Sequence, residues 1–289
     1  MRRTGLGFIA LFALGLSGCF LSRMDASSLW PSRSHSAEAA PGPDMVFMDV
    51  ALLEVPVGDR YVNEELWNAA DEQIQSIPPS LRKTLEENGL RIGLVGGRTP
   101  DGLLGLLTNE RSNPKPRQWL RRTGNPAPIP IGSRLERCEF PLYADAKADP
   151  ISFEQAQCQV QLLPTLEADG RVRVQFTPQI EFRDPKKWSR LNPAIALNVQ
   201  GQRSTETFSA LRAEVGLGAN EYLLIGARFD RPKSLGFKFL VSTDPEHPLQ
   251  RLIAIRAGRF AAAGDLPHSP AEARPTGKTK PLAAQAAGR

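Results

Sequence analysis

Side chains that commonly perform chemistry are scarce in this sequence. Its 289 residues include three histidines and three cysteines. His35 and His268 lie in Ser-, Ala- and Pro-rich ends, and His247 lies between Glu246 and Pro248. The sequence contains neither a serine-centred nucleophile elbow nor a zinc-binding His-Glu-x-x-His helix. It therefore predicts a protein that is not an enzyme and that needs no metal or other cofactor.

Cys19 has the most informative chemical setting of the three cysteines. Arg2 and Arg3 form a basic start, and the eleven residues from Leu6 to Leu16 form an apolar stretch. This stretch is shorter than the ~20 residues that a transmembrane helix needs, but it suits the core of a signal peptide. It ends in Leu16-Ser17-Gly18-Cys19, which resembles the lipobox of bacterial lipoproteins.

The lipobox resemblance implies both a modification and a location. In that family the cysteine thiol receives a diacylglyceryl group, the signal peptide is removed, and the new amine is acylated, as with palmitate. Each buried methylene contributes about 0.8 kcal/mol, so several acyl chains anchor a protein permanently. Phe20 follows the cysteine, whereas lipoproteins with Asp there are often kept at the inner membrane. The resemblance thus implies an outer-membrane, periplasm-facing protein; the alternative is an ordinary secretory peptide or a membrane helix.

Cys138 and Cys158 remain after lipidation of Cys19. In an oxidising compartment they could form a disulfide bond. The bond would close about twenty residues and contribute roughly 3 kcal/mol to stability. Two reduced cysteines buried in the core are the alternative interpretation.

Two segments combine basic residues with Trp. The net charge of +5 falls by two when Arg2 and Arg3 are removed, which is too mild to indicate nucleic acid. We interpret the two segments either as contacts to anionic lipid headgroups, lipopolysaccharide or cell-wall polymer, or as solvated loops with a packing Trp. Their residues are Lys115, Arg117, Trp119, Arg121 and Arg122 in the first, and Lys186, Lys187 and Trp188 in the second.

Proline and small polar residues divide the chain into segments. Such stretches bury too little apolar surface to offset the entropy of ordering them. A structureless run longer than ~15 residues is also uncommon inside a compact domain. The predicted segments are a signal peptide (1–18), a lipidated cysteine with a flexible spacer (19–44), an α+β module (45–110), a Pro-rich basic linker (111–134), an antiparallel β-domain (135–260) and a disordered tail (261–289).

Hydrophobic periodicity predicts the elements of the two folded segments. The module has the order β-α-α-β-α: a strand at 45–57, helices at 62–74 and 81–88, a strand at 90–95, and a helix that begins at Thr99-Pro100. In the β-domain, Asp169-Gly170 predicts a hairpin between strands at 157–162 and 171–176. Further strands are predicted at 211–217, 222–229, 237–242 and 251–256. The predicted fold class is therefore α+β, a small module followed by an antiparallel domain.

The predicted β-domain carries motifs of a known family. The hairpin from Val160 to Ile180 resembles the signature hairpin of bacterial secretins, the channels of type II and III secretion and type IV pili. The segment Leu211–Gly226 is similar to the strand–turn–strand of that family, and Leu252–Arg256 looks like its final strand. The resemblance covers Gln157 to Phe260 and implies a secretin-like β-domain.

These observations lead to one hypothesis and one rival. The hypothesis is a non-catalytic, membrane-anchored periplasmic lipoprotein whose secretin-like domain serves envelope assembly, scaffolding or secretion. It would associate with itself or with an envelope protein, and not with nucleic acid, through an open strand edge, for which residues 157–163 are the predicted candidate. The rival is a lipoprotein that binds a small solute or a cell-wall fragment in a deep polar pocket.

Overall fold

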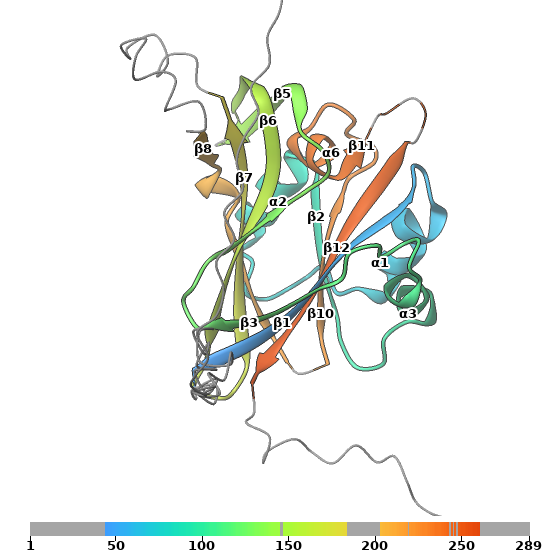
Figure 1. Ribbon diagram of the computed structural model, residues 1–289, viewed down its shortest axis with the longest axis vertical. Coiled ribbons are helices and arrows are strands. Elements are labelled where there is room, and N and C mark those ends of the chain that lie inside the picture. The colour runs from blue at the N-terminus through green and yellow to red at the C-terminus, as the bar shows by residue number, and fades with distance from the viewer. Residues whose placement is uncertain are drawn as a thin grey trace, which may run out of the picture. The chain divides into compact units, whose positions relative to one another are not determined.

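The computed structural model describes residues 44–144, 147–183, 203–218, 220–242, 244, 246 and 248–260. Two antiparallel sheets with a few short helices make up this part of the chain (Figure 1). The predicted α+β class is therefore confirmed. The predicted signal peptide, Cys19, almost all of the predicted spacer, and the predicted tail from residue 261 lie outside the described residues.

The first sheet, called sheet A here, has the strand order β2-β10-β12-β1-β3, and β11 pairs with β12 at its side. All of its pairings are antiparallel. Its strands are β1 (Met45–Pro56), β2 (Leu90–Val95), β3 (Arg117–Arg122), β10 (Tyr222–Ala227), β11 (Val241–Ser242) and β12 (Leu249–Arg259).

The second sheet, sheet B, has the order β4-β6-β7-β8, with β5 also paired to β6 and β9 to β7. Its strands are β4 (Ala127–Pro130), β5 (Leu135–Ala144), β6 (Lys147–Leu166), β7 (Val172–Phe182), β8 (Ser204–Thr207) and β9 (Ala213–Leu217). The predicted hairpin is confirmed as β6–β7, and Gly170 in its turn has a φ of +85°, a conformation that favours glycine.

The helices are short. They are the π-helix η2 (Tyr61–Glu65), α1 (Leu66–Ala69), α2 (Pro79–Glu87), α3 (Asp101–Thr108), the 3₁₀-helix η3 (Ser209–Leu211) and α6 (Leu235–Leu240). The confirmed predictions include α2 and α3. The helix predicted at 62–74 ends earlier, because the backbone turns extended at Ala70 and Asp71 then bridges to Leu94 of β2.

Strand β1 explains how the core is divided. Its side chains alternate between two faces, and both faces are buried. Met48 and Val50 face the large core that also holds Phe176 of β7, whereas Leu53 faces a second cluster with Trp67. Burial on both faces accounts for the long apolar run of β1, since each fully buried aliphatic side chain contributes about 1.5–3 kcal/mol.

Residues 45–110 are not a separate module, so that prediction is wrong. β1 pairs along its whole length with β12, the last described strand, and β2 pairs with β10. The chain from residue 40 onward forms one compact unit. Local periodicity identified β1 and β2 correctly, but pairing between distant strands leaves no local trace in a sequence.

Residues 111–134 are not a linker either. They contain β3, which extends sheet A, and β4, which pairs with β6 of sheet B. The prolines that suggested a linker are compatible with β4 because it lies at a sheet edge, where Pro128 and Pro130 both point to solvent.

The strand predicted at 237–242 is wrong over most of its length. The segment forms helix α6, and only Val241–Ser242 is strand. Ser234 caps the helix, since its hydroxyl accepts a hydrogen bond from the Phe237 amide at 3.3 Å. A cap serine followed by the buried pair Leu235 and Phe239, four residues apart, is the helical signal that strand periodicity concealed.

Candidate functional site

The free edge of β3 is the candidate interaction site. β3 lies at the end of sheet A and, among the strands that the structure describes, pairs only with β1. Contacts at both ends of β3 fix its position: Glu54 donates its amide hydrogen to the carbonyl of Ser112 at 2.7 Å, and Thr123 donates to the carbonyl of Asp44 at 2.9 Å. Thr123 also accepts a hydrogen bond from the amide of Leu166 at 2.9 Å, which ties β3 to sheet B.

The backbone of Gln118 and Leu120 faces outward. Alternate residues of an antiparallel strand direct their amide and carbonyl to the same side. Asp44 and Glu54 direct theirs toward the β3 side, so the even-numbered residues of β1 pair with Arg117, Trp119 and Arg121. The amide and carbonyl groups of Gln118 and Leu120 therefore point off the edge, where another chain can reach them.

Basic side chains surround this edge. Lys115 and Arg117 have no ion-pair partner among the described residues. Arg121 lies over the ring of Trp119, with its guanidinium carbon 5.5 Å from the ring centre. Arg122 approaches Asp44 at 3.4 Å, an exposed pair of little energetic weight. The edge thus combines unpaired backbone groups with positive charge.

The two faces of β3 differ in chemistry. Arg117, Trp119 and Arg121 share one face, and Trp119 packs against the core between the sheets. Leu120 is on the other face and is 42% exposed. Leu120 lies across from Phe47 of β1, whose ring in turn covers Gly258 of β12.

The structure unites five of the eight basic and Trp residues that the sequence singled out. Lys115, Arg117, Trp119, Arg121 and Arg122 lie on or beside β3. Lys186, Lys187 and Trp188 lie outside the described residues. Sequence reasoning missed Gln118 and Leu120; the alternation of Arg117 to Arg122 is a strand signal, but the surrounding prolines favoured a loop.

The edge predicted at residues 157–163 is not open. These residues belong to β6, which pairs with β7 throughout this stretch. On the other side, Gln159 to Leu162 pair with β4. Since β6 is an interior strand here, its backbone groups are already used in the sheet, and the prediction is wrong.

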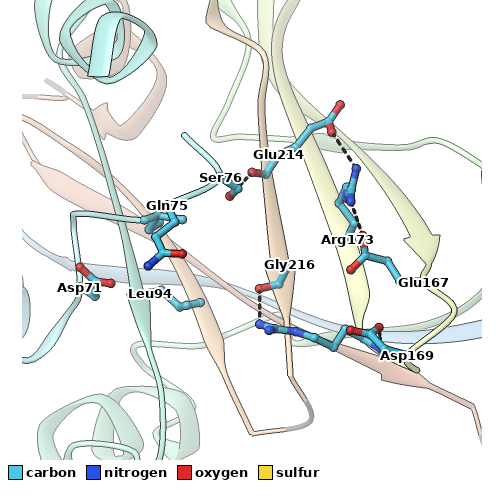
Figure 2. A pocket seen from close by; sticks show the side chains of 11 residues that line it. Asp71, Gln75, Ser76, Leu94, Glu167, Asp169, Arg173, Glu214 and Gly216 are labelled. Carbon is cyan, nitrogen blue, oxygen red and sulfur yellow. Dashed lines mark hydrogen bonds and ion pairs between the residues drawn. The ribbon is translucent and has the colours of Figure 1, made fainter. Parts of the chain in front are cut away.

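A polar cleft of about 530 Å³ lies between the two sheets (Figure 2). The loop before α2 and the β6–β7 turn line it, together with β9. Arg173 lies between Glu167 and Glu214, and it forms ion pairs with both. Arg171 donates to the carbonyl of Gly216 at 3.2 Å. The cationic groups of the cleft are thus paired internally, while Asp71 and Asp169 add negative charge.

Cys138 and Cys158 lie in the core as free thiols that share a hydrogen bond. Cys138 is on β5 and Cys158 on β6, and both are buried. The hydrogen bond with Cys138, together with burial, raises the pKa of Cys158 well above its usual value. A buried, protonated thiol such as that of Cys158 reacts slowly, whereas the same interaction lowers the pKa of Cys138.

Metal binding and membrane crossing concern the described part of the chain as a whole. Within it, no three His, Cys, Asp or Glu residues gather in a way that could hold a metal ion. None of the helices described there has the length and apolar character needed to cross a bilayer.

Comparisons with known proteins find structural similarity at low identity and low TM-score. No protein-family model and no curated protein matches it. Among solved structures, the InvG secretin-domain β-barrel of the Salmonella SPI-1 injectisome is 10% identical, with a TM-score of 0.18 over 75% of this chain and 61% of that one. The cryo-EM structure of the InvG secretin from the same injectisome is 11% identical, with a TM-score of 0.16 over 75% of this chain and 63% of that one.

A third structure, the basal body of the same injectisome with InvG, PrgH and PrgK, is 11% identical, with a TM-score of 0.16 over 75% of this chain and 45% of that one. The chain thus spans less than two thirds of each of these secretin chains. They belong to the group that the motifs from Gln157 to Phe260 resemble, but similarity at this level supports no functional assignment.

Proposed function

We propose that this chain is a non-catalytic, lipid-anchored protein of the bacterial outer membrane that faces the periplasm and holds a partner protein during envelope assembly or secretion. The observation that carries the proposal is the free edge of β3, where backbone groups that are unpaired among the described residues coincide with Lys115 and Arg117, which have no ion-pair partner there. The lipobox-like Leu16–Cys19 supplies the anchor.

An interaction role also agrees with the distribution of reactive groups. The two cysteines of the core are buried, and Arg173 of the cleft is already paired with Glu167 and Glu214. By contrast, a strand edge binds through main-chain hydrogen bonds and requires no reactive side chain. The binding surface and the anchor would together hold a partner at the membrane.

The anchor is tested by Cys19→Ser, with Cys138→Ala as the matched cysteine control. The protein is expressed in cells given radiolabelled palmitate, and membranes are separated by density. We expect label and outer-membrane fractionation for the wild type and for Cys138→Ala. We expect neither for Cys19→Ser. Lipidation would be refuted if Cys19→Ser and the wild type associated equally with the membrane and neither protein carried the label.

The scaffolding role is tested by recovering the full chain from detergent-solubilised membranes and identifying the proteins that accompany it in stoichiometric amount. The proposal expects a defined partner that resists washing in detergent. A chain that is recovered alone from membranes, at its normal expression level and after mild cross-linking, would refute it.

A second candidate is binding of a small solute or cell-wall fragment in the cleft near Arg173. Its volume of about 530 Å³ is within the range of ligand pockets, although such pockets are mostly apolar. Four carboxylates against two guanidinium groups favour a ligand that carries amines. Calorimetric titration with amine-bearing wall fragments tests this candidate, and Asp169→Asn should weaken binding if it is correct.

A further inference from the structure

We infer that the partner presents an extended segment with alternating acidic and apolar residues, and that this segment adds to sheet A as a new strand beside β3. The inference rests on the proposed scaffolding function and specifies its partner. It follows from three properties of the β3 edge: its backbone, its two faces and its charge.

The backbone supplies the general affinity. Gln118 and Leu120 offer amide and carbonyl groups at the spacing of an antiparallel ladder, and the described residues give these groups no partner. Because both ends of β3 are held by hydrogen bonds from Glu54 and Thr123, the edge is ordered before binding. A preordered edge loses little entropy when a strand is added.

The side chains supply the sequence preference. In adjacent strands, side chains that lie on the same face of the sheet are neighbours. On one face, the added strand meets Arg117 and Arg121, which favour carboxylates. On the other face it meets Leu120 beside Phe47, which favour an apolar side chain at that position. Gln118 and Arg122 flank Leu120 on this face, and Arg122 is paired with Asp44. Successive residues of a strand alternate in face, so the preferred segment alternates acidic and apolar residues.

The same features disfavour a second copy of this chain as the occupant. Antiparallel pairing of two β3 strands about Trp119 would place Arg117 of one copy opposite Arg121 of the other. Like charges directly opposite one another destabilise a strand pair. In that register β3 suits an acidic partner better than a second copy.

The position of Trp119 disfavours a lipid surface. A Trp that anchors a protein at a membrane extends its ring into the interface. Trp119 instead packs against the core between the sheets, and Arg121 covers its ring. The positive charge remains accessible, but the Trp119 ring is not free to enter a bilayer beside it.

The inference is tested with the full chain in detergent micelles and fluorescently labelled short peptides. One peptide alternates Glu and Val, and a second alternates Lys and Val. A third alternates Glu and Pro, so that every second amide hydrogen, at the positions of Val in the first peptide, is missing. We expect fluorescence anisotropy to show that only the Glu-Val peptide binds. We also expect its affinity to fall when salt is added. Equal binding of the Glu-Val and Glu-Pro peptides would overturn strand addition.

Two variants of the edge separate the backbone from the charge. Leu120→Pro removes an outward amide hydrogen that sheet A does not use, and an edge strand tolerates proline at such a position. We expect about tenfold weaker binding, because one hydrogen bond is lost and the ring obstructs the ladder. Leu120→Ala keeps the amide and should bind better than Leu120→Pro.

For the charge, Arg117→Glu should also weaken binding about tenfold, whereas Arg98→Glu, an exposed reversal away from β3, should not. Arg117→Glu does not alter the backbone, so it tests the inference even if Leu120→Pro fails to fold. Binding that is unchanged in Arg117→Glu would overturn the acidic preference.

Other occupants give recognisable outcomes. A wild-type dimer in light scattering that Leu120→Pro converts to monomer would mean a second copy occupies the edge. Tight binding to phosphatidylglycerol vesicles that Arg117→Glu abolishes and Leu120→Pro leaves unchanged would mean a lipid surface. Either result overturns the inference. A membrane partner that co-purifies equally with the wild type and both variants would refute this edge while leaving the scaffolding function intact.

Discussion

Arg251 and Glu54 lie directly opposite one another on β12 and β1, and the Arg251 Nε donates to the Glu54 Oε1 at 2.9 Å. The Arg251 side chain is 11% exposed and that of Glu54 is 26% exposed. The pair therefore joins the first and last described strands of the folded unit in a partly buried setting. The same register brings Asp49 and Arg256 together farther along the two strands.

We predict that Arg251→Ala lowers the free energy of unfolding by about 1.5–3 kcal/mol, because a partly buried charge-assisted hydrogen bond is lost and Glu54 remains without its partner. Arg98→Ala, which removes an exposed ion pair with Asp101, should cost less than about 0.5 kcal/mol. Urea denaturation measures both effects, provided that the dependence of the unfolding free energy on urea concentration is the same in both variants. Equal losses in the two variants would contradict the prediction.

A fragment of residues 45–110 should not fold. β1 would lose both of its neighbours, β12 and β3, and β2 would lose β10. The fragment would then expose Met48 and Leu53 on opposite faces of an unpaired strand. Circular dichroism and amide-proton dispersion should show an unfolded chain, whereas the full chain should unfold in one transition by two spectroscopic probes. An ordered fragment would show that the module is autonomous after all.

Gly236→Ala should destabilise the protein by about 1–3 kcal/mol or more, because a Cβ at this position would lie 2.1 Å from the carbonyl oxygen of Gly89 and the backbone would have to shift. Gly105→Ala is the matched control on α3, where nothing lies within 4 Å of the new Cβ. It should stabilise the protein by up to about 1 kcal/mol, as expected in an exposed helix interior. Thermal unfolding of the two variants distinguishes a close approach from a general effect of alanine.

Cys138 and Cys158 should form a disulfide bond in protein isolated from the periplasm, with a periplasmic dithiol oxidase taking up the two electrons and two protons. Both thiols are buried in the same core, and an oxidising compartment favours the bond. Maleimide labelling in denaturant should then fail without reductant and modify both cysteines after reduction. Full labelling without reductant would show two reduced core thiols instead.

Local signals made part of this fold predictable. Asp169-Gly170 marked the β6–β7 turn, and apolar spacing located α2 and α3. The pairing of β1 with β12 was not predictable, because it depends on residues about two hundred positions apart. α6 was missed because a short apolar run suits either a strand or a helix, and its cap at Ser234 decides between them.

The candidate site was predictable in its charge but not in its structure. Trp119 and the four basic residues around it stand out in the sequence, and all five lie on or beside β3. β3 has one open side because of the position it takes in sheet A, and that position is a property of the tertiary fold. The predicted edge in β6 failed for the same reason, since β4 and β7 both cover it.

The two ends of the folded unit adjoin, since the amide of Phe260 donates to the carbonyl of Met45 at 2.9 Å. Met45 also lies opposite Arg122, so the proposed binding edge begins where the chain leaves toward Cys19. The 24 residues between Cys19 and Asp44 limit how far the proposed anchor can lie from this edge. Partners anchored in the same membrane would therefore meet β3 at a high effective concentration, and even a weak strand contact would be well occupied there.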